Sequence, residues 1–332
     1  MIPFSILDLA PVVEGGDVRQ SLASSVALAQ AGERLGYNRF WLAEHHGMQG
    51  IASAATSVVI GHVAGGTERI RVGAGGIMLP NHAPLLIAEQ FGTLEALYPG
   101  RIDLGLGRAP GSDSKVAQAM KRDLYAAAER FPQDVAELLG YFEGKGPVEA
   151  VPGSGAQVPV WMLGSSLFGA QVAAHFGLPY AFASHFAPAA MMEAIAVYRE
   201  RFQPSARLDK PYVMLGYNIV AAETDEEAQY LSTSLLQAFV NLGQGMPGRL
   251  PRPIKGYEAA LPPQSRARLE GVLSASAIGS KATVKNSVRA FLDRTGADEL
   301  IVAASIHDFD SRVRSYEIAA EARADLARET AA

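Results

Sequence analysis

The chain has 332 residues, of which 48% are hydrophobic and 19% are charged, and its formal net charge is -5. This composition supports one large core and argues against disorder. The charged residues are scattered and form no basic run, so we expect neither nucleic acid nor a membrane surface as a partner. The chain has no cysteine, which excludes disulfides, thiolate metal sites and a cysteine nucleophile.

The amino terminus has none of the features of a targeting segment. It carries no basic region, is interrupted by Pro3 and Asp8, and leads directly into a strand-like run. No stretch reaches the ~20 apolar residues that a membrane span requires. We therefore expect a cytoplasmic protein.

The first elements form a β-α-β unit. A strand is expected at 3–9, and Asp17 is expected to cap a helix that ends at Gly36. The apolar run at 39–43 indicates a buried parallel strand. Ser53 is then expected to cap a second helix that reaches Gly65.

Strands and helices continue to alternate along the rest of the chain. Further strands are predicted at 70–73, 102–106, 158–163, 180–183, 213–221 and 300–304, and helical regions at 84–98, 114–142, 167–176, 189–202, 225–242 and 310–328. Eight strands at an even period, without a mid-chain linker, favour a single (β/α)8 barrel domain over 1–332. The segment 241–280 is Pro- and Gly-rich and too long for an ordinary connection, so we interpret it as a lid inserted before the last strand.

Three ionisable residues, Glu44, His45 and His46, follow the strand at 39–43. Adjacent strand residues point to opposite faces, so both histidines cannot bind one metal ion without a local bend. Strand-end histidines can also be purely structural. The interpretation we favour is one histidine acting as a catalytic acid or base, with no metal.

Two glycine-rich stretches follow predicted strands. The glycines at 73, 75 and 76 permit close approach of a flat ligand, although an ordinary turn explains them equally well. The stretch Gly105–Gly111 fails the dinucleotide-binding pattern, because its third glycine is one place late and Pro110 intervenes. Arg108 remains a candidate anion ligand.

A candidate phosphate site lies between the predicted strand at 158–163 and the following helix. Gly164, Ser165 and Ser166 would offer free N–H groups and two hydroxyls at a helix amino terminus, although simple capping by serine is an alternative. A phosphate site beside a glycine surface suggests a phosphorylated planar cofactor. His185 also follows a strand, and a place in the site and a place in the core are equally compatible with the sequence.

Several of these stretches together resemble the bacterial luciferase-like flavin monooxygenase family. The motifs are Trp-Leu-Ala-Glu-His-His at 41–46, Arg-Val-Gly-Ala-Gly-Gly-Ile-Met-Leu-Pro at 71–80, Gly-Arg-Ile-Asp-Leu-Gly-Leu-Gly-Arg at 100–108, Met-Leu-Gly-Ser-Ser at 162–166 and Ser-Ala-Ile-Gly-Ser at 276–280. They occur in order and cover essentially the whole chain.

The resemblance implies a dimeric (β/α)8 barrel that binds reduced FMN at the carboxyl ends of its strands and uses O2 to oxygenate a small organic substrate. It makes His45 the catalytic histidine and Gly75-Gly76 a non-prolyl cis peptide behind the flavin ring. Cofactor phosphate contacts are implied for Arg108, Ser165, Ser166 and Gly169, next to the candidate Gly164.

Light emission is not expected, because Gly107 stands where light-emitting luciferase has a reactive cysteine. No NAD(P)H site is visible, so reduced flavin would come from a separate reductase. Two alternatives remain open, namely an F420-dependent hydride-transfer oxidoreductase on the same barrel and a flavin-binding protein without turnover.

Overall fold

The computed structural model describes residues 2–108, 114–121 and 123–331. Its strands are β1 (Phe4–Asp8), β2 (Arg39–Leu42), β3 (Arg71–Met78), β4 (Ile102–Gly107), β5 (Val160–Gly164), β6 (Tyr180–Phe182), β7 (Val213–Ala221), β8 (Ser276–Gly279) and β9 (Glu299–Ala303). All paired strands are parallel, and β1 to β7 followed by β9 close into a ring. The predicted eight-stranded barrel is confirmed.

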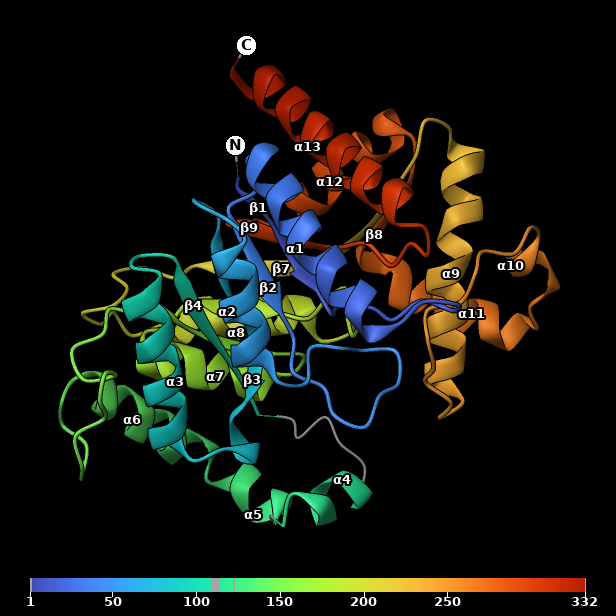
Figure 1. The fold of residues 1–332 in the computed structure, drawn as a ribbon. Coiled ribbons are helices and arrows are strands. Elements are labelled where there is room, and N and C mark those ends of the chain that lie inside the picture. Colours follow the sequence, from blue (N-terminus) through green and yellow to red (C-terminus); the bar gives the residue numbers. More distant parts are fainter. Residues whose placement is uncertain (1, 109–113, 122, 332) are drawn as a thin grey trace.

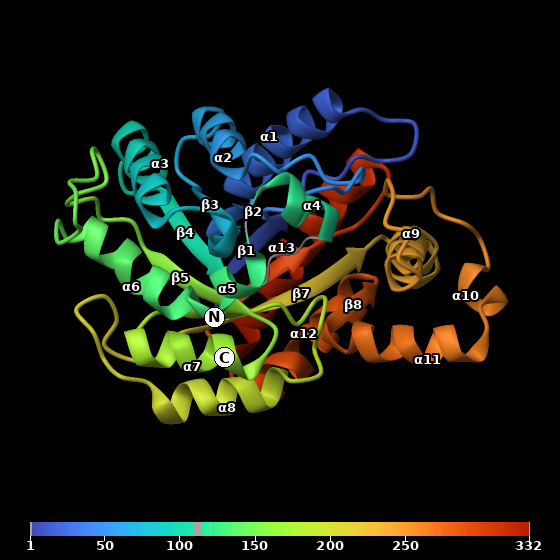
Figure 2. The same ribbon diagram turned by 90° about the horizontal axis from the view of Figure 1, so that it is seen from below.

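Helices surround this ring. They are α1 (Val18–Arg34), α2 (Thr56–Gly65), α3 (Pro84–Leu97), α4 (Ser114–Ala119), α5 (Leu124–Glu129), α6 (Phe131–Phe142), α7 (Leu167–Phe176), α8 (Met191–Arg201), α9 (Asp225–Gly243), α10 (Tyr257–Ala260), α11 (Pro263–Val272), α12 (Lys281–Thr295) and α13 (Phe309–Ala331). Figure 2 shows α1 to α3 on one side of the strands and α7 and α8 on the other. None of the helices in the described part of the chain is both long and apolar enough to cross a bilayer.

Local sequence signals explain several element boundaries. The Asp17 side chain accepts a hydrogen bond from the Gln20 N–H at 2.8 Å and so caps α1, as predicted. Pro84 opens α3, also as predicted. Ser53 does not cap α2, because its hydroxyl donates to the Ala43 carbonyl at 2.6 Å and the helix begins at Thr56.

The segment 241–280 contains more regular structure than the sequence indicated. Helices α10 and α11 pack beside α9 at one side of the barrel (Figure 1), where Leu261 and Leu269 bury their side chains against Leu236. The segment ends in β8, which pairs with the far half of β7 from Asn218 to Ala221. Neither β8 nor α12 is among the elements predicted from the sequence.

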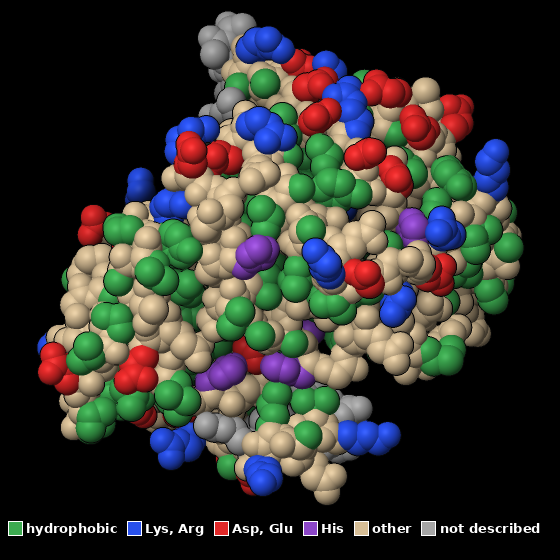
Figure 3. All heavy atoms as spheres, in the orientation of Figure 1, with side chains coloured by type: hydrophobic (Ala, Val, Ile, Leu, Met, Phe, Trp, Pro, Cys, Tyr) green, Lys and Arg blue, Asp and Glu red, His purple; other side chains and the backbone are tan. Residues whose placement is uncertain are grey.

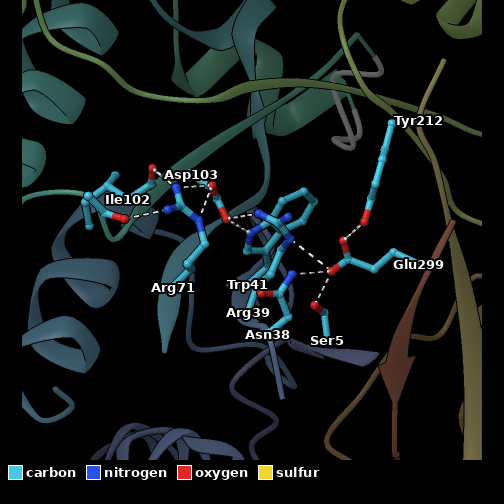
Figure 4. Close-up of polar contacts among 10 residues, drawn as sticks. Ser5, Asn38, Arg39, Trp41, Arg71, Ile102, Asp103, Tyr212 and Glu299 are labelled. Atoms are coloured by element: carbon cyan, nitrogen blue, oxygen red, sulfur yellow. Dashed lines mark hydrogen bonds and ion pairs between the residues drawn. The ribbon is translucent and has the colours of Figure 1, made fainter. Parts of the chain in front are cut away.

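Buried polar side chains fill the amino-terminal end of the barrel. Arg39, at the start of β2, donates to Asp103 at 2.8 Å and to Glu299 at 2.9 Å, and Arg71 donates to Asp103 at 2.6 Å (Figure 4). Burial disfavours the charge on Arg39, but the two carboxylates outweigh this and raise its pKa.

Trp41 and Trp161 pack against these polar side chains at the amino-terminal end of the barrel. Trp41 donates from its indole N–H to Asp103 at 3.1 Å, and its ring meets Trp161 edge-on with centroids 5.2 Å apart. The Arg39 guanidinium carbon lies 4.7 Å from the centre of the Trp161 ring. The amino end is therefore filled, whereas the carboxyl ends of the strands are free to form a site.

Candidate active site

A cavity of about 330 Å³ lies at the carboxyl ends of the strands, beneath α9 and the segment that follows it. Most of its lining is apolar, and its polar or charged lining residues are His45, His185, Asn218, Asn241, Arg249, Ser305 and Arg312. A largely apolar pocket with a few converging polar groups is the usual form of a small-molecule site.

His45 faces this cavity from the loop after β2. Its side chain lines the cavity, and its Nδ1 atom is buried. Burial lowers the pKa of His45, against the opposing effects of the neighbouring Glu44 carboxylate and the Ala43 backbone. The imidazole is therefore neutral near pH 7.

Glu44 points away from the cavity and fastens the loops around it. Its carboxylate is 1% exposed and accepts hydrogen bonds from the Met78 N–H and the Asn81 amide, with His46 and His82 also within hydrogen-bond distance. Burial works to raise the pKa of Glu44, but these contacts, chiefly those of His82, outweigh it and hold the pKa below its ordinary value.

His46 thus has a different surrounding from His45. Its Nε2 lies 2.7 Å from the Glu44 carboxylate. Figure 3 shows histidine side chains gathered in the lower middle of this face with a small area of acidic surface between them. The part of the chain that the structure describes holds no group of three or more His, Cys, Asp or Glu side chains that could bind a metal ion.

The Gly75-Gly76 peptide is cis, as the family resemblance implied. Gly75 lines the cavity, and a Cβ atom there would lie 3.0 Å from Leu7 and 3.1 Å from Trp41. A Cβ atom on Gly76 would lie 2.5 Å from the Gly105 carbonyl oxygen. Any larger residue at Gly76 would therefore force the two strands apart.

A second group of predicted residues lies at the amino terminus of α7. Ser166 occupies the capping position but makes no side-chain capping bond, and both it and Ser165 are exposed. The serine-capping alternative is therefore not realised, and the terminal N–H groups keep their capacity for an anion. Gly164 and Gly169 pack closely, since a Cβ atom on Gly164 would lie 3.4 Å from the Gly169 Cα.

Arg108 joins this group from the end of β4. Its guanidinium carbon lies 4.1 Å from the centre of the Phe168 ring in the first turn of α7. The cavity lining thus brings together His45 and Gly75, while Arg108, Gly164, Ser165, Ser166 and Gly169 form a neighbouring group outside that lining. The remainder of the Gly105–Gly111 stretch, from residue 109 on, lies outside the described residues.

His185 lies in the cavity, which the sequence had left open. Asn218, on β7, also faces the cavity and was not singled out from the sequence, because it stands within an otherwise apolar run. The alternation of side chains along β7 could have indicated it, since Met214, Gly216 and Asn218 share the inward face.

A closed parallel barrel with a half-buried histidine in an apolar cavity at the carboxyl ends of its strands has the arrangement of an α/β-barrel enzyme. The family model described as luciferase-like monooxygenase matches residues 2–299. The chain therefore belongs to the luciferase-like monooxygenase family, whose members are oxidoreductases.

Individual relatives agree over nearly the whole length. A luciferase-like monooxygenase of Escherichia coli strain K12 is 50% identical over 328 residues, covering 98% of both chains. The crystal structure of apo-MsnO8 has 36% identity and a TM-score of 0.91, covering 97% of this chain and 98% of that one.

More distant solved structures share the fold alone. The oxygenating constituent of 3,6-diketocamphane monooxygenase, a type II Baeyer-Villiger enzyme of Pseudomonas putida in complex with FMN, has 18% identity and a TM-score of 0.70, covering 96% of this chain and 97% of that one. An F420-dependent secondary alcohol dehydrogenase has 14% identity and a TM-score of 0.63, covering 97% of this chain and 98% of that one.

Proposed function

We propose that this protein is an FMN-dependent monooxygenase that uses reduced FMN and O2 to oxygenate a small organic substrate. The observation that carries the proposal is the neutral imidazole of His45 in an apolar cavity that also includes Gly75. Reduced FMN, when bound, would supply the electrons that activate O2. The protein's own residues would bind the cofactor, exclude water from the site, and donate or accept a proton.

The cofactor phosphate would bind at the amino terminus of α7. Free N–H groups there carry partial positive charge, the Ser165 and Ser166 hydroxyls are exposed, and Arg108 adds a full positive charge. Phe168 holds the Arg108 side chain by stacking at 4.1 Å, so the guanidinium lies over the first turn of the helix. This donor set fits a phosphate group.

The flat ring of the cofactor would lie against Gly75 and Gly76. Neither residue has a side chain, and Leu7 and Trp41 support this surface from the barrel interior. A smooth backbone surface backed by rigid side chains suits the close approach of a planar ring. The donor set and this surface together support the cofactor assignment.

His45 would hold or transfer a proton at Nε2, because its Nδ1 atom is buried. Since the ring lines the cavity and is neutral near pH 7, it can accept a proton or a hydrogen bond from substrate or cofactor. Glu44 cannot take this role, since its carboxylate is engaged by the loop after β3.

The lid would exclude water from this site. Pro247, Gly248 and Leu250 line the cavity from above. Leu250 is hydrogen bonded through its backbone to Val12 at 3.0 Å and to Glu14 at 2.9 Å, which secures the lid to the loop after β1. An apolar cavity covered in this way would protect a reactive cofactor from water.

The proposal also includes a separate flavin reductase, because no NAD(P)H site is visible in the sequence, and a homodimer, which the family resemblance implies. The substrate would be a small organic molecule.

Anaerobic titration with reduced FMN, followed by stopped-flow mixing with O2 in the presence of aldehydes, sulfonates or polyketide-like aromatics, tests the proposal. We expect reduced FMN to bind and one atom of 18O2 to appear in a product. Tight F420 binding with hydride transfer and no oxygen incorporation would instead support the alternative oxidoreductase. FMN binding without turnover of any substrate would support the flavin-binding alternative.

The role of His45 has its own test. We expect His45→Ala to bind reduced FMN nearly as well as the wild type but to lose oxygen incorporation, while His175→Ala, at an exposed position of α7, keeps both. Equal turnover by His45→Ala would remove His45 from the mechanism.

A further inference from the structure

We propose that the substrate of the cavity is an amphipathic organic acid, whose carboxylate binds Arg268 and Arg294 in a groove that continues from the cavity past α9. This inference rests on the proposed function, because it names the substrate class of the same cavity. It follows from the way in which three hollows of the described structure adjoin one another.

A side pocket opens from the cavity between α9 and α11, which lie side by side in Figure 1. Its volume is about 190 Å³. Phe186, Phe239 and Leu242 line both the cavity and this side pocket, so the two spaces meet at these three side chains.

An outer groove extends the side pocket towards the surface. Phe186, Arg268 and Val272 line both the side pocket and the outer groove, and Met192 of α8 and Arg294 of α12 line the groove further out. The cavity, the side pocket and the outer groove therefore lie in series, from the carboxyl ends of the strands to the solvent.

One apolar stripe of α9 follows the inner part of this path. Leu235, Phe239 and Leu242 are spaced by four and three residues, which places them on one face of the helix. Leu235 lines the cavity alone, whereas Gly243 lines the side pocket alone. The eight residues between these two positions span about 12 Å of helix, so an extended apolar chain can lie along the stripe.

The outer groove presents large apolar side chains to the solvent. Phe186 is 49% exposed and Met192 is 44% exposed. Exposed apolar side chains gathered at one groove mark a binding surface. Because this surface is continuous with the cavity, it favours a single ligand that occupies both over a separate partner protein.

Arg268 supplies a positive charge where the side pocket meets the outer groove. A Cβ atom on Gly243 would lie 2.5 Å from its Nη1 and 2.7 Å from its Cζ, so the guanidinium packs against the backbone of α9. Its Nη1 donates to the Gly243 carbonyl at 3.4 Å, which is a long and weak hydrogen bond.

Arg294 adds a second positive charge to the outer groove. Its Nη2 donates to the Ser274 carbonyl at 3.5 Å, again a weak contact. Within the described residues neither Arg268 nor Arg294 forms an ion pair, and no acidic side chain lines the side pocket or the outer groove. Both guanidinium groups are therefore available to an anion.

This arrangement suits a carboxylate at the outer end of an apolar chain. A planar carboxylate accepts two parallel hydrogen bonds from one guanidinium. Both arginines are exposed, so water and salt weaken their attraction, and they orient the ligand more than they hold it. Burial of the apolar chain in the cavity and the side pocket provides most of the affinity.

Binding of decanoate and of 1-decanol to the flavin-free full-length chain tests this inference apart from turnover. Isothermal titration calorimetry at pH 7 and low ionic strength measures both dissociation constants. We expect decanoate to bind about fivefold more tightly than the uncharged alcohol. This difference should disappear when the salt concentration is raised, because the charges are exposed.

Charge variants identify the carboxylate site. Arg268→Gln should weaken decanoate about fivefold and leave 1-decanol unchanged, and the double variant with Arg294→Gln should weaken decanoate about tenfold. Arg266→Gln is the matched control, since Arg266 is exposed on the same helix but lies two residues away on another face. It should change neither constant.

A space-filling variant tests the apolar part of the path. Val272→Trp would fill the side pocket, so we expect it to weaken both decanoate and 1-decanol about tenfold. Glu270→Trp, at an exposed position of the same helix, should leave both unchanged. Circular dichroism checks that each variant is folded.

Four outcomes would overturn the inference: no binding of decanoate, equal weakening of acid and alcohol by Arg268→Gln, equal effects of Arg268→Gln and Arg266→Gln, or unchanged constants in Val272→Trp. Reduced FMN binding is measured separately on the same proteins. Decanoate binding that depends on Arg268 in a chain that does not bind reduced FMN would leave this inference standing and remove the proposed function. Oxygenation by a chain whose decanoate affinity is independent of Arg268 would do the reverse.

Discussion

Nε2 of His82 lies 2.9 Å and 3.0 Å from the two carboxylate oxygens of Glu44, joining the loop after β3 to the loop after β2. The Glu44 N–H also donates to the Gly76 carbonyl at 3.1 Å. Glu44 therefore positions both the neighbouring His45 and the Gly75-Gly76 peptide without touching the cavity itself.

We expect Glu44→Gln to lower the free energy of unfolding by about 2 kcal/mol or more, because an amide donor would replace an oxygen that only accepts. Urea unfolding at pH 7 measures this. Glu68→Gln, at a side chain that is 84% exposed, should change stability by less than about 0.5 kcal/mol.

The same variant should show a characteristic pH dependence. The pKa of Glu44 is lowered in the folded protein, so its stabilisation is present above the unfolded-state pKa and is lost as pH falls through the folded-state value. The stability difference between wild type and Glu44→Gln should therefore shrink in acid. A difference that grows as pH falls would contradict this assignment.

His185 should make the wild type less stable as pH falls below neutrality. Its folded pKa of about 4 is below the unfolded value, so between the two the unfolded chain binds the extra proton and unfolding becomes easier. Between pH 7 and pH 5 the free energy of unfolding should therefore fall further in the wild type than in His185→Gln. We expect the difference between the two decreases to be on the order of 2 kcal/mol. His175→Gln should follow the wild-type curve, and parallel curves for all three proteins would refute the prediction.

Gly76→Ala should be strongly destabilising, by about 3 kcal/mol or more, because its Cβ atom would meet the Gly105 carbonyl at 2.5 Å. Thermal unfolding followed by circular dichroism measures the loss. Gly271→Ala is the matched control, since nothing lies within 4 Å of a Cβ atom at this position in α11. That control should be neutral or slightly stabilising.

Asp103→Asn should cost about 3 to 5 kcal/mol of stability, because Arg39 and Arg71 would keep buried charges without their shared carboxylate. Asp209→Asn, at an exposed position, should be neutral. Since Asp103 lies at the amino end of the barrel, FMN affinity of the folded variant should match that of the wild type. If Asp103→Asn instead weakened FMN binding and left stability unchanged, Asp103 would contribute to the cofactor site rather than to the stability of the barrel.

Arg108→Ala should weaken FMN binding about tenfold or more, because a charged hydrogen bond to phosphate is lost. Fluorescence titration measures the dissociation constant, with the exposed Arg19→Ala as control. An unchanged constant for Arg108→Ala would remove this residue from the phosphate site. Riboflavin, which lacks the phosphate, should bind the variant and the wild type alike.

The sequence was informative where the signal is local. The ring strands are apolar runs next to turn residues, and the Asp17 cap and the Pro84 helix start depend only on their neighbours. The four-residue strand β8 lacked such a signal, because it lies in a Gly- and Pro-rich segment and exists through its pairing with β7.

The candidate site shows the same division. His45 could be predicted from its place after a buried strand. The contacts of Glu44 with Asn81 and His82 span 37 and 38 residues, and the place of the His185 ring depends on Gly216, so these required the folded barrel. Ser53 satisfied the rule for a helix cap, but the Ala43 carbonyl was a better partner in the folded chain.

The filled amino-terminal end of the barrel bears on the order in which a cofactor and a substrate can bind. Arg39, Asp103, Trp41 and Trp161 fill the amino end in the described structure, and the cavity lies at the opposite end, beneath Pro247, Gly248 and Leu250. If the proposed cofactor ring lies against Gly75, a substrate placed above it would have to bind after the cofactor and leave before it.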